Sequence, residues 1–267
     1  MKGSIHSAFL GLASGISVLA YLFPYFNLPG IWWRAIPSTI VILLTGAVTQ
    51  GEGALVFFGL RMPLRELLLS VSLFIVGLCA SRYLILPVVT GETLTASLNN
   101  HPLGYVHQFF QALNDEMMLR AACLTLILRI LPYPKTVVLA TAALSSVGHH
   151  LVYRMNGVAI DWPAMLSLFS FGTIANLLFV RFGHIGYGVA LHYAWNFFRF
   201  SATFVLDGHP LSEGVTFNYV EGNPWVVAGS VVALALTSIA LVRGVGPRST
   251  GSRLASTNAS QHQHASD

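Results

Sequence analysis

Charged residues are scarce in this chain. Asp, Glu, Lys and Arg together make up 9% of its 267 residues, whereas a soluble domain carries about 25%. Apolar residues make up 54%, and the mean hydropathy is +0.67. This composition excludes a soluble domain with a single core and predicts a protein that crosses a lipid bilayer several times.

Cysteine is also rare. Cys79 and Cys123 both lie in apolar runs, which is typical of small buried side chains and argues against a disulfide or a cysteine-based metal site. The net charge of +4 comes from basic residues scattered along the chain. We therefore expect no nucleic-acid partner and interpret these charges as topological signals in loops.

Long apolar runs account for most of the chain, and one crossing needs about 20 apolar residues. We therefore predict an all-α, polytopic membrane fold with about eight transmembrane helices. Because further spans follow the first, that span is interpreted as an uncleaved helix rather than a signal peptide. The predicted spans lie near residues 5–26, 35–59, 67–89, 105–131, 135–153, 164–181, 185–206 and 224–243.

The spans divide the chain into four parts. We expect about three helices in 1–104, a core of about four helices in 105–206, a loop and a final helix in 207–243, and a disordered tail in 244–267. Basic residues gather in alternate loops, so the positive-inside rule places both termini in the cytoplasm.

Three charges interrupt the apolar run 105–131. These are Asp115, Glu116 and Arg120, and a charge at bilayer depth costs at least about 2.5 kcal/mol. Glu116 and Arg120 are four residues apart, so they share a helix face, while Asp115 points about 100° away. A structural ion pair would explain Glu116 and Arg120, but it leaves Asp115 unexplained.

Two further spans carry polar side chains at depth. His149 and His150 are adjacent in the fifth span, and His192 and Asn196 lie four apart in the seventh. Each group alone is consistent with a polar contact between helices. Together with the carboxylates they indicate hydrolysis by water in a membrane cavity, since His192 and Asn196 can donate hydrogen bonds to an oxyanion.

The order of these motifs resembles the CPBP family, the CAAX-protease and bacteriocin-processing intramembrane proteases related to the Ras-converting prenyl protease. The family pattern is Glu-Glu-x-x-x-Arg, then Phe-x-x-x-His, then His-x-x-x-Asn/Asp, and the likeness covers about residues 105–205. The corresponding segments here are Asp115-Glu116-Met-Met-Leu-Arg120, Ser145-Ser-Val-Gly-His149 and His192-Tyr-Ala-Trp-Asn196.

Two departures leave alternatives open. Aspartate stands at the first glutamate of the pattern, so either Asp115 activates the water or Glu116 has taken over that role. Serine replaces the phenylalanine whether His149 or His150 is the motif histidine; we favour His149.

The resemblance implies an intramembrane endopeptidase whose residues have separate roles. Asp115 or Glu116, with His149, would activate water, and Arg120 would hold the carboxylates. His192 and Asn196 would stabilise the oxyanion. No cofactor is expected; a divalent metal such as zinc, held by Glu116, His149 and His192, is the alternative.

The expected partners are the lipid bilayer and a membrane-anchored protein or peptide substrate, cut near its end. By the likeness to bacterial relatives we expect an integral protein of a bacterial cytoplasmic (inner) membrane. The depth of the polar residues predicts a cavity that opens to the extracytoplasmic side. The alternatives are a non-catalytic immunity or scaffold protein and, less favoured, a transporter.

Overall fold

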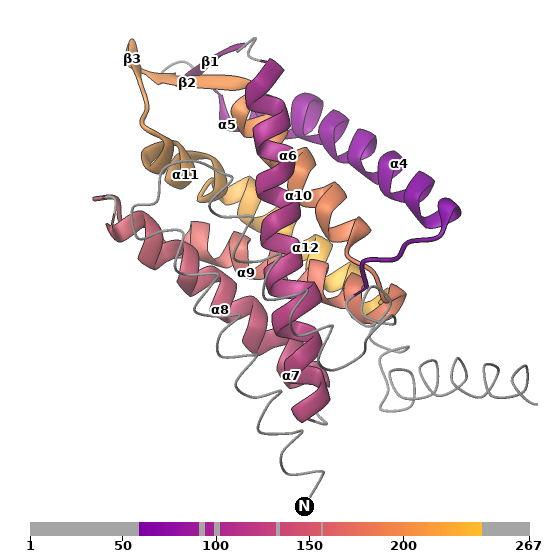
Figure 1. Cartoon of the computed structure of the whole chain (residues 1–267). Helices are drawn as coiled ribbons and strands as arrows, with labels where there is room; N and C mark the ends of the chain where they lie inside the picture. The colour runs from indigo at the N-terminus through magenta and orange to yellow at the C-terminus, as the bar shows by residue number, and fades with distance from the viewer. Residues whose placement is uncertain (1–58, 91–93, 99–101, 132–133, 156, 242–267) are drawn as a thin grey trace, which may run out of the picture.

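The computed structural model describes residues 59–90, 94–98, 102–131, 134–155 and 157–241 (Figure 1). The predicted span 5–26, nearly all of 35–59 and the tail 244–267 lie outside the described residues. The part that the structure describes is mostly helical, which confirms the predicted all-α membrane fold. The number of eight spans stays a prediction.

The helices follow one another with short connections. Two of them contain a π-helical stretch, η3 and η4, in which the backbone hydrogen bonds are wider than in an α-helix. The elements are α4 (Leu64–Ala80), η3 (Ser81–Ile85), α5 (Leu86–Val89), α6 (Pro102–Glu116), η4 (Met117–Leu124), α7 (Thr125–Ile130), α8 (Pro134–Met155), α9 (Trp162–Phe182), α10 (Gly186–Phe200), α11 (Glu213–Glu221) and α12 (Pro224–Leu241).

Four helical segments of the described chain are long and apolar enough to cross a membrane: Leu64–Val89, Pro134–Met155, Trp162–Phe182 and Pro224–Leu241. They coincide with four predicted spans. A fifth continuous helix runs through α6, η4 and α7, fills the predicted span 105–131 and carries the buried charges.

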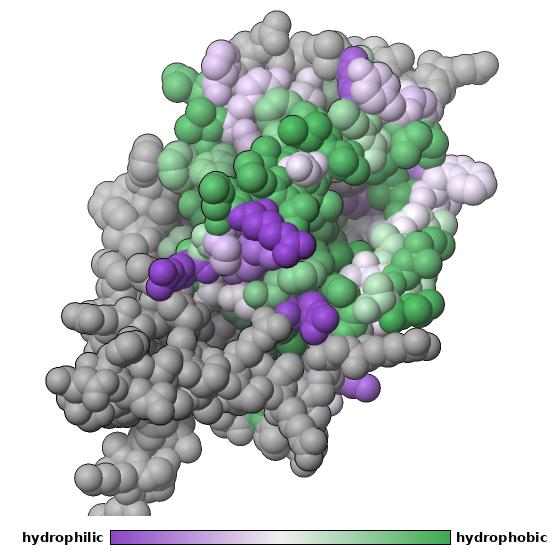
Figure 2. Space-filling model, turned by 90° about the vertical axis from the view of Figure 1, so that its right-hand side faces the viewer, coloured by the Kyte–Doolittle hydropathy of each residue, from purple (hydrophilic) through white to green (hydrophobic). Residues whose placement is uncertain are grey.

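Large apolar side chains are exposed over the outer surfaces of these helices, as expected for surfaces that contact lipid. Leu68 and Val76 of α4, and Trp225 and Leu236 of α12, are among them. Figure 2 shows apolar side chains over much of one face, with hydrophilic side chains confined to a few places among the described residues.

The predicted span 185–206 is wrong at its C-terminal end. Helix α10 ends at Phe200, and the chain continues as strand β2 (Ala202–Leu206). Strand β2 pairs antiparallel with β1 (Leu94–Leu98) and with β3 (His209–Pro210). The β2–β3 turn is Asp207-Gly208, and both residues have positive φ. An Asp-Gly pair is a typical two-residue hairpin turn, so the run after Phe200 forms a hairpin strand rather than more helix.

The predicted loop 207–223 also differs from the structure. It contains helix α11, whose residues Thr216, Phe217 and Val220 are buried against the rest of the molecule. Asn218 fixes this helix to the segment before α9, because its side chain donates to the Ala159 carbonyl and accepts from the Asp161 amide.

Helices α6 and α10 pack antiparallel and place the functional residues (Figure 1). The ring of Tyr105 stacks on Phe197 with centroids 4.3 Å apart, and Phe109 meets Tyr193 edge-on at 5.3 Å. About two turns further along α6, Gly188 of α10 lies against the Glu116 carboxylate, where a Cβ atom would collide. This register brings the end of α6 beside the first half of α10.

Candidate active site

Glu116, the last residue of α6, lies at the centre of the polar cluster. Its side chain is fully buried. Its Oε1 atom accepts a hydrogen bond from Arg120 Nη1 at 2.9 Å and lies 3.1 Å from His192 Nδ1. The structure therefore contains the Glu116–Arg120 pair expected from the sequence and joins it to the histidine of α10.

Arg120 fixes this carboxylate to the neighbouring helix α9. Arg120 Nε donates to Asn176 Oδ1 at 3.0 Å, and Nη2 donates to the Gly172 carbonyl at 3.4 Å. Asn176 in turn donates to the Val138 carbonyl and the Thr141 hydroxyl of α8. A buried ion pair is stable only when its remaining donors are also satisfied. Asn176 therefore stabilises the Glu116–Arg120 pair by accepting the Nε hydrogen of Arg120. Asn176 was not singled out from the sequence, although an amide in an apolar span is itself a signal.

Asp115 has a different environment from its neighbour. It lines a large cavity, and its Oδ2 atom lies 3.9 Å from His192 Nε2. Glu116 is not part of the cavity wall. The two adjacent carboxylates thus flank one imidazole, with Asp115 on the cavity side and Glu116 on the protein side.

His149 also lines the cavity, whereas His150 does not. His149 Nδ1 lies 2.9 Å from the Ser145 carbonyl oxygen. A carbonyl only accepts hydrogen bonds, so Nδ1 carries the proton and Nε2 of the neutral ring is an acceptor. His150 Nδ1 is buried without a hydrogen-bond partner in the part of the chain that the structure describes.

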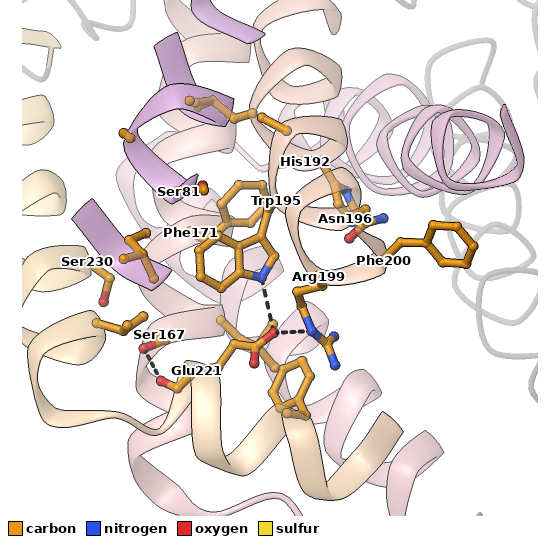
Figure 3. A pocket seen from close by; sticks show the side chains of 18 of the residues that line it. Ser81, Ser167, Phe171, His192, Trp195, Asn196, Arg199, Phe200, Glu221 and Ser230 are labelled. Carbon is orange, nitrogen blue, oxygen red and sulfur yellow. Dashed lines mark hydrogen bonds and ion pairs between the residues drawn. The ribbon is translucent and has the colours of Figure 1, made fainter. Parts of the chain in front are cut away.

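His192 and Asn196 lie one turn apart on α10, and both line the cavity (Figure 3). The Phe171 ring packs edge-on against the His192 imidazole, with centroids 5.5 Å apart. Together with Asp115 and His149, these residues bring side chains from α6, α8 and α10 to one cavity, as the motif order predicts.

Residues 98–198 match the family model Rce1-like, described as type II CAAX prenyl endopeptidase Rce1-like. This segment is an Rce1-like domain. The relationship inferred from the motifs is thereby confirmed. No curated protein and no solved structure matches the chain. The seven site residues expected from the sequence, Asp115, Glu116, Arg120, His149, His150, His192 and Asn196, all lie inside the Rce1-like domain.

The cavity extends from the Rce1-like domain to elements that lie outside it. Its volume is about 1660 Å³, larger than the 300–1,000 Å³ typical of a small-molecule site. Residues 107–115 of α6 and the C-terminal half of α10 form part of its wall, with η3, β2, α11 and α12. A cavity of this size and shape can hold a stretch of polypeptide.

A second polar cluster lies in the same cavity wall and was missed from the sequence. Glu221 of α11 is only 3% exposed, and its Oε1 accepts from Trp195 Nε1 at 3.0 Å. The same oxygen lies 3.2 Å from Arg199 Nε (Figure 3). Glu221 lies in the predicted loop 207–223. The signal that could have found this cluster is the spacing of His192, Asn196 and Arg199, which places all three on one helix face.

The described residues contain no group of three His, Cys, Asp or Glu side chains arranged to hold a metal ion. Glu116, His149 and His192, the ligands expected for zinc, therefore do not converge on one point.

Proposed function

We propose that this protein is an intramembrane endopeptidase that hydrolyses a peptide bond near the end of a membrane-anchored protein. The observation that carries the proposal is the placement of Asp115, His149, His192 and Asn196 around one cavity in an Rce1-like domain. A carboxylate, a neutral imidazole and an amide are the groups that peptide hydrolysis by water requires.

Asp115 and His149 activate the water in this proposal. Asp115 removes one proton, and His149 Nε2, the acceptor nitrogen, orients the other hydrogen. The water oxygen forms a bond to the carbonyl carbon, whose oxygen becomes an oxyanion. When the tetrahedral intermediate collapses, the carbon–nitrogen bond breaks and the proton on Asp115 passes to the leaving amine.

Asn196 and His192 stabilise the oxyanion. The Asn196 amide donates through its N–H groups, and His192 donates through Nε2 when both ring nitrogens carry protons. Glu116 is a positioning residue. Its Oε1 holds Nδ1 of His192 and so directs Nε2 of that ring towards Asp115 and the cavity. Arg120 keeps Glu116 in place.

The cavity opens, in this proposal, to the extracytoplasmic side. Its wall includes the end of α10 and strand β2, and the positive-inside topology places these segments outside the cytoplasm. The protein would then act in a bacterial cytoplasmic membrane on the exposed tail of a lipid- or helix-anchored substrate.

The test uses the full chain reconstituted in liposomes, with a prenylated tail peptide that carries a fluorophore and a quencher on either side of the cleavage region. We expect Asp115→Asn to lower kcat about 10²–10⁴-fold, the usual contribution of a general base. Asp161→Asn is the matched control, because Asp161 is exposed and lies outside the cavity wall.

Full activity in both Asp115→Asn and Glu116→Gln would overturn the proposed hydrolase. Total inactivity of the folded wild-type chain against a panel of such tails would favour the non-catalytic immunity or scaffold protein instead. Loss of activity in Asp115→Asn alone would show that Asp115 activates the water. Loss of activity in Glu116→Gln alone would show that Glu116 activates it.

A further inference from the structure

A second, smaller pocket lies between the start of α4 and the turn that joins α9 to α10. Pro63 and Glu66 line it on one side, and Arg181, Phe182 and His184 line it on the other. Its volume is about 290 Å³, just below the range typical of a small-molecule site. None of these residues lines the large cavity, so a ligand bound here would be separate from a substrate of the proposed peptidase.

Both sides of this pocket lie where a candidate membrane span ends. The span Leu64–Val89 begins directly after Pro63, and the span Trp162–Phe182 ends at the pocket. The pocket therefore lies at the level of the lipid head groups, which flank the hydrocarbon core. Arg61 and Arg65 are exposed at the same end of the spans, so the positive-inside rule places the pocket at the cytoplasmic surface.

His184 places a buried hydrogen-bond donor at the pocket wall. Its side chain is 3% exposed. The Gly186 amide donates to its Nδ1 at 3.2 Å, so in the neutral ring Nε2 carries the proton. Nε2 has no hydrogen-bond partner among the described residues, and Glu66 Oε2, at 3.6 Å, is too far away for one. Because an unsatisfied buried donor is costly, a ligand that supplies an acceptor oxygen is favoured here.

The two charged residues that line the pocket have opposite signs. The Tyr187 hydroxyl donates to Glu66 Oε2 and orients this carboxylate, so Oε1 is the oxygen left to accept from a ligand. Arg181 is exposed at the end of α9 and presents a planar fork of N–H donors that matches phosphate oxygens. A ligand that matches this pocket therefore carries an anionic group for Arg181 and His184 and a cationic group for Glu66.

We propose that this pocket binds the head group of an aminophospholipid at the cytoplasmic surface of the membrane. The phosphate accepts hydrogen bonds from Arg181 and from His184 Nε2, and the primary ammonium donates to Glu66 Oε1. The first turn of α4, a helix of 17 residues, adds the positive end of its dipole beside the phosphate. Basic pockets between transmembrane helices on the cytoplasmic side are suited to phospholipid head groups. This inference does not depend on the proposed peptidase function.

A bound head group would add to contacts that already join α4 to the α9–α10 turn. The Ile185 amide donates to the Gly59 carbonyl, just before α4, at 3.1 Å. Tyr187, which holds the pocket carboxylate, belongs to the first turn of α10 and precedes Gly188, which lies against Glu116. Because a ligand that binds only the folded state stabilises it, the bound lipid should raise the unfolding temperature.

The experiment compares lipids that differ only in their head groups. The full chain, purified in a mild detergent, receives phosphatidylethanolamine, phosphatidylcholine or phosphatidylglycerol with identical acyl chains. Native mass spectrometry counts the bound lipids, and thermal unfolding measures the stabilisation. We expect phosphatidylethanolamine to bind at least about tenfold more tightly than the other two, because choline has no N–H to donate and glycerol has no cation. Excess inorganic phosphate, the other source of the same anion, should not displace it.

Two substitutions test the two charges of the pocket separately. Arg181→Gln should weaken binding of phosphatidylethanolamine at least about tenfold, because it removes the cation that binds the phosphate. Glu66→Gln should reduce the difference between phosphatidylethanolamine and phosphatidylcholine to within about twofold, because the amide carries no charge. Arg82→Gln is the matched control, since Arg82 is exposed on η3 and does not line the pocket. Asp115→Asn, which alters only the large cavity, should also keep the full preference.

Equal binding of phosphatidylethanolamine and phosphatidylcholine by wild type would overturn the proposal, and this result needs no variant to fold. Tighter binding of phosphatidylglycerol would show a site for anionic head groups and would also overturn it. Displacement of the lipid by inorganic phosphate would show a site for a soluble anion instead. A preference that Asp115→Asn abolishes and Arg181→Gln retains would place the lipid in the large cavity, which contradicts the proposal.

Discussion

His192 Nδ1 lies 3.1 Å from Glu116 Oε1, although the two residues are 76 positions apart in the chain. This contact joins the helix that carries the carboxylates to the helix that carries the proposed oxyanion donors. The two adjacent carboxylates have different positions. Asp115 faces the cavity, whereas Glu116 contacts the His192 imidazole on the side away from the cavity.

Substitution of Glu116 should lower the stability of the protein, whereas substitution of Asp115 should lower its activity with little change in stability. Glu116→Gln leaves Arg120 as an uncompensated buried charge, and breaking a buried pair typically costs about 3–5 kcal/mol. We expect a clearly lower unfolding temperature in detergent for Glu116→Gln and nearly the wild-type value for Asp115→Asn. Thermal unfolding of the purified chain, followed by tryptophan fluorescence, measures the difference. A larger loss of stability in Asp115→Asn would contradict the assigned positions.

Gly188 should tolerate no side chain. A Cβ atom there would collide with the Glu116 carboxylate, so Gly188→Ala must displace the group that positions His192. We expect cleavage to fall at least about tenfold, because a displacement of 1 Å can cost 10²-fold, and stability to fall by about 1–3 kcal/mol. Gly229→Ala on α12 is the matched control, since nothing lies within 4 Å of its added Cβ. An unchanged rate in Gly188→Ala would show that Glu116 does not position the site.

The adjacent histidines should differ in function. His149→Gln should lower kcat about 10²–10⁴-fold by removing the group that orients the water. His150→Leu should retain activity and alter stability by less than about 1 kcal/mol, because it removes a buried nitrogen that has no partner among the described residues. Cleavage rates and unfolding temperatures of the two variants decide between them, and the reverse pattern would make His150 the motif histidine.

Acid should destabilise the turn between α9 and α10. Burial lowers the pKa of His184 below its usual value, although Glu66 nearby opposes this shift. The unfolded chain therefore binds more protons at this residue, so its contribution to stability is full above the unfolded pKa of about 6.5 and is lost as the pH falls towards the folded value. The unfolding temperature between pH 5 and 8 should depend less steeply on pH in His184→Gln than in wild type. If the unfolding temperature depends equally on pH in both proteins, burial of His184 does not contribute to the acid sensitivity.

Chelation should leave the rate unchanged. In the proposed reaction Asp115 and His149 activate the water, and His192 and Asn196 stabilise the oxyanion, without a metal ion. We expect incubation with EDTA or 1,10-phenanthroline to change cleavage by less than about twofold. If chelation abolishes cleavage and added Zn²⁺ restores it, the reaction requires a metal that is held by ligands other than these four residues alone.

The sequence was sufficient to predict the helical membrane class and the residues that meet at the site. Helical spacing places Glu116 near Arg120 and His192 near Asn196, and charges at bilayer depth need internal partners. Local patterns cannot show how two helices rotate against each other, which decides that Asp115 rather than Glu116 faces the cavity. That choice depends on the α6–α10 register, set by contacts such as Tyr105 with Phe197.

The sequence misleads at two elements, and only one of the two reasons is visible in the sequence. The apolar run through Ala202–Leu206 has the hydrophobicity of a span, but its Asp207-Gly208 turn belongs to a hairpin. Glu221 follows a polar loop, and only tertiary packing brings it to Trp195 and Arg199. Average hydropathy along the chain contains no information on such contacts.

The small sheet has a mechanical consequence for the two helices that carry the proposed chemistry. Strand β1 precedes α6 and strand β2 follows α10, and the two strands are hydrogen-bonded over five residue pairs from Leu94–Leu206 to Leu98–Ala202. A sliding motion of α6 along α10 would have to break this ladder. The sheet therefore opposes a change of register between α6 and α10, which would separate Asp115 from His192.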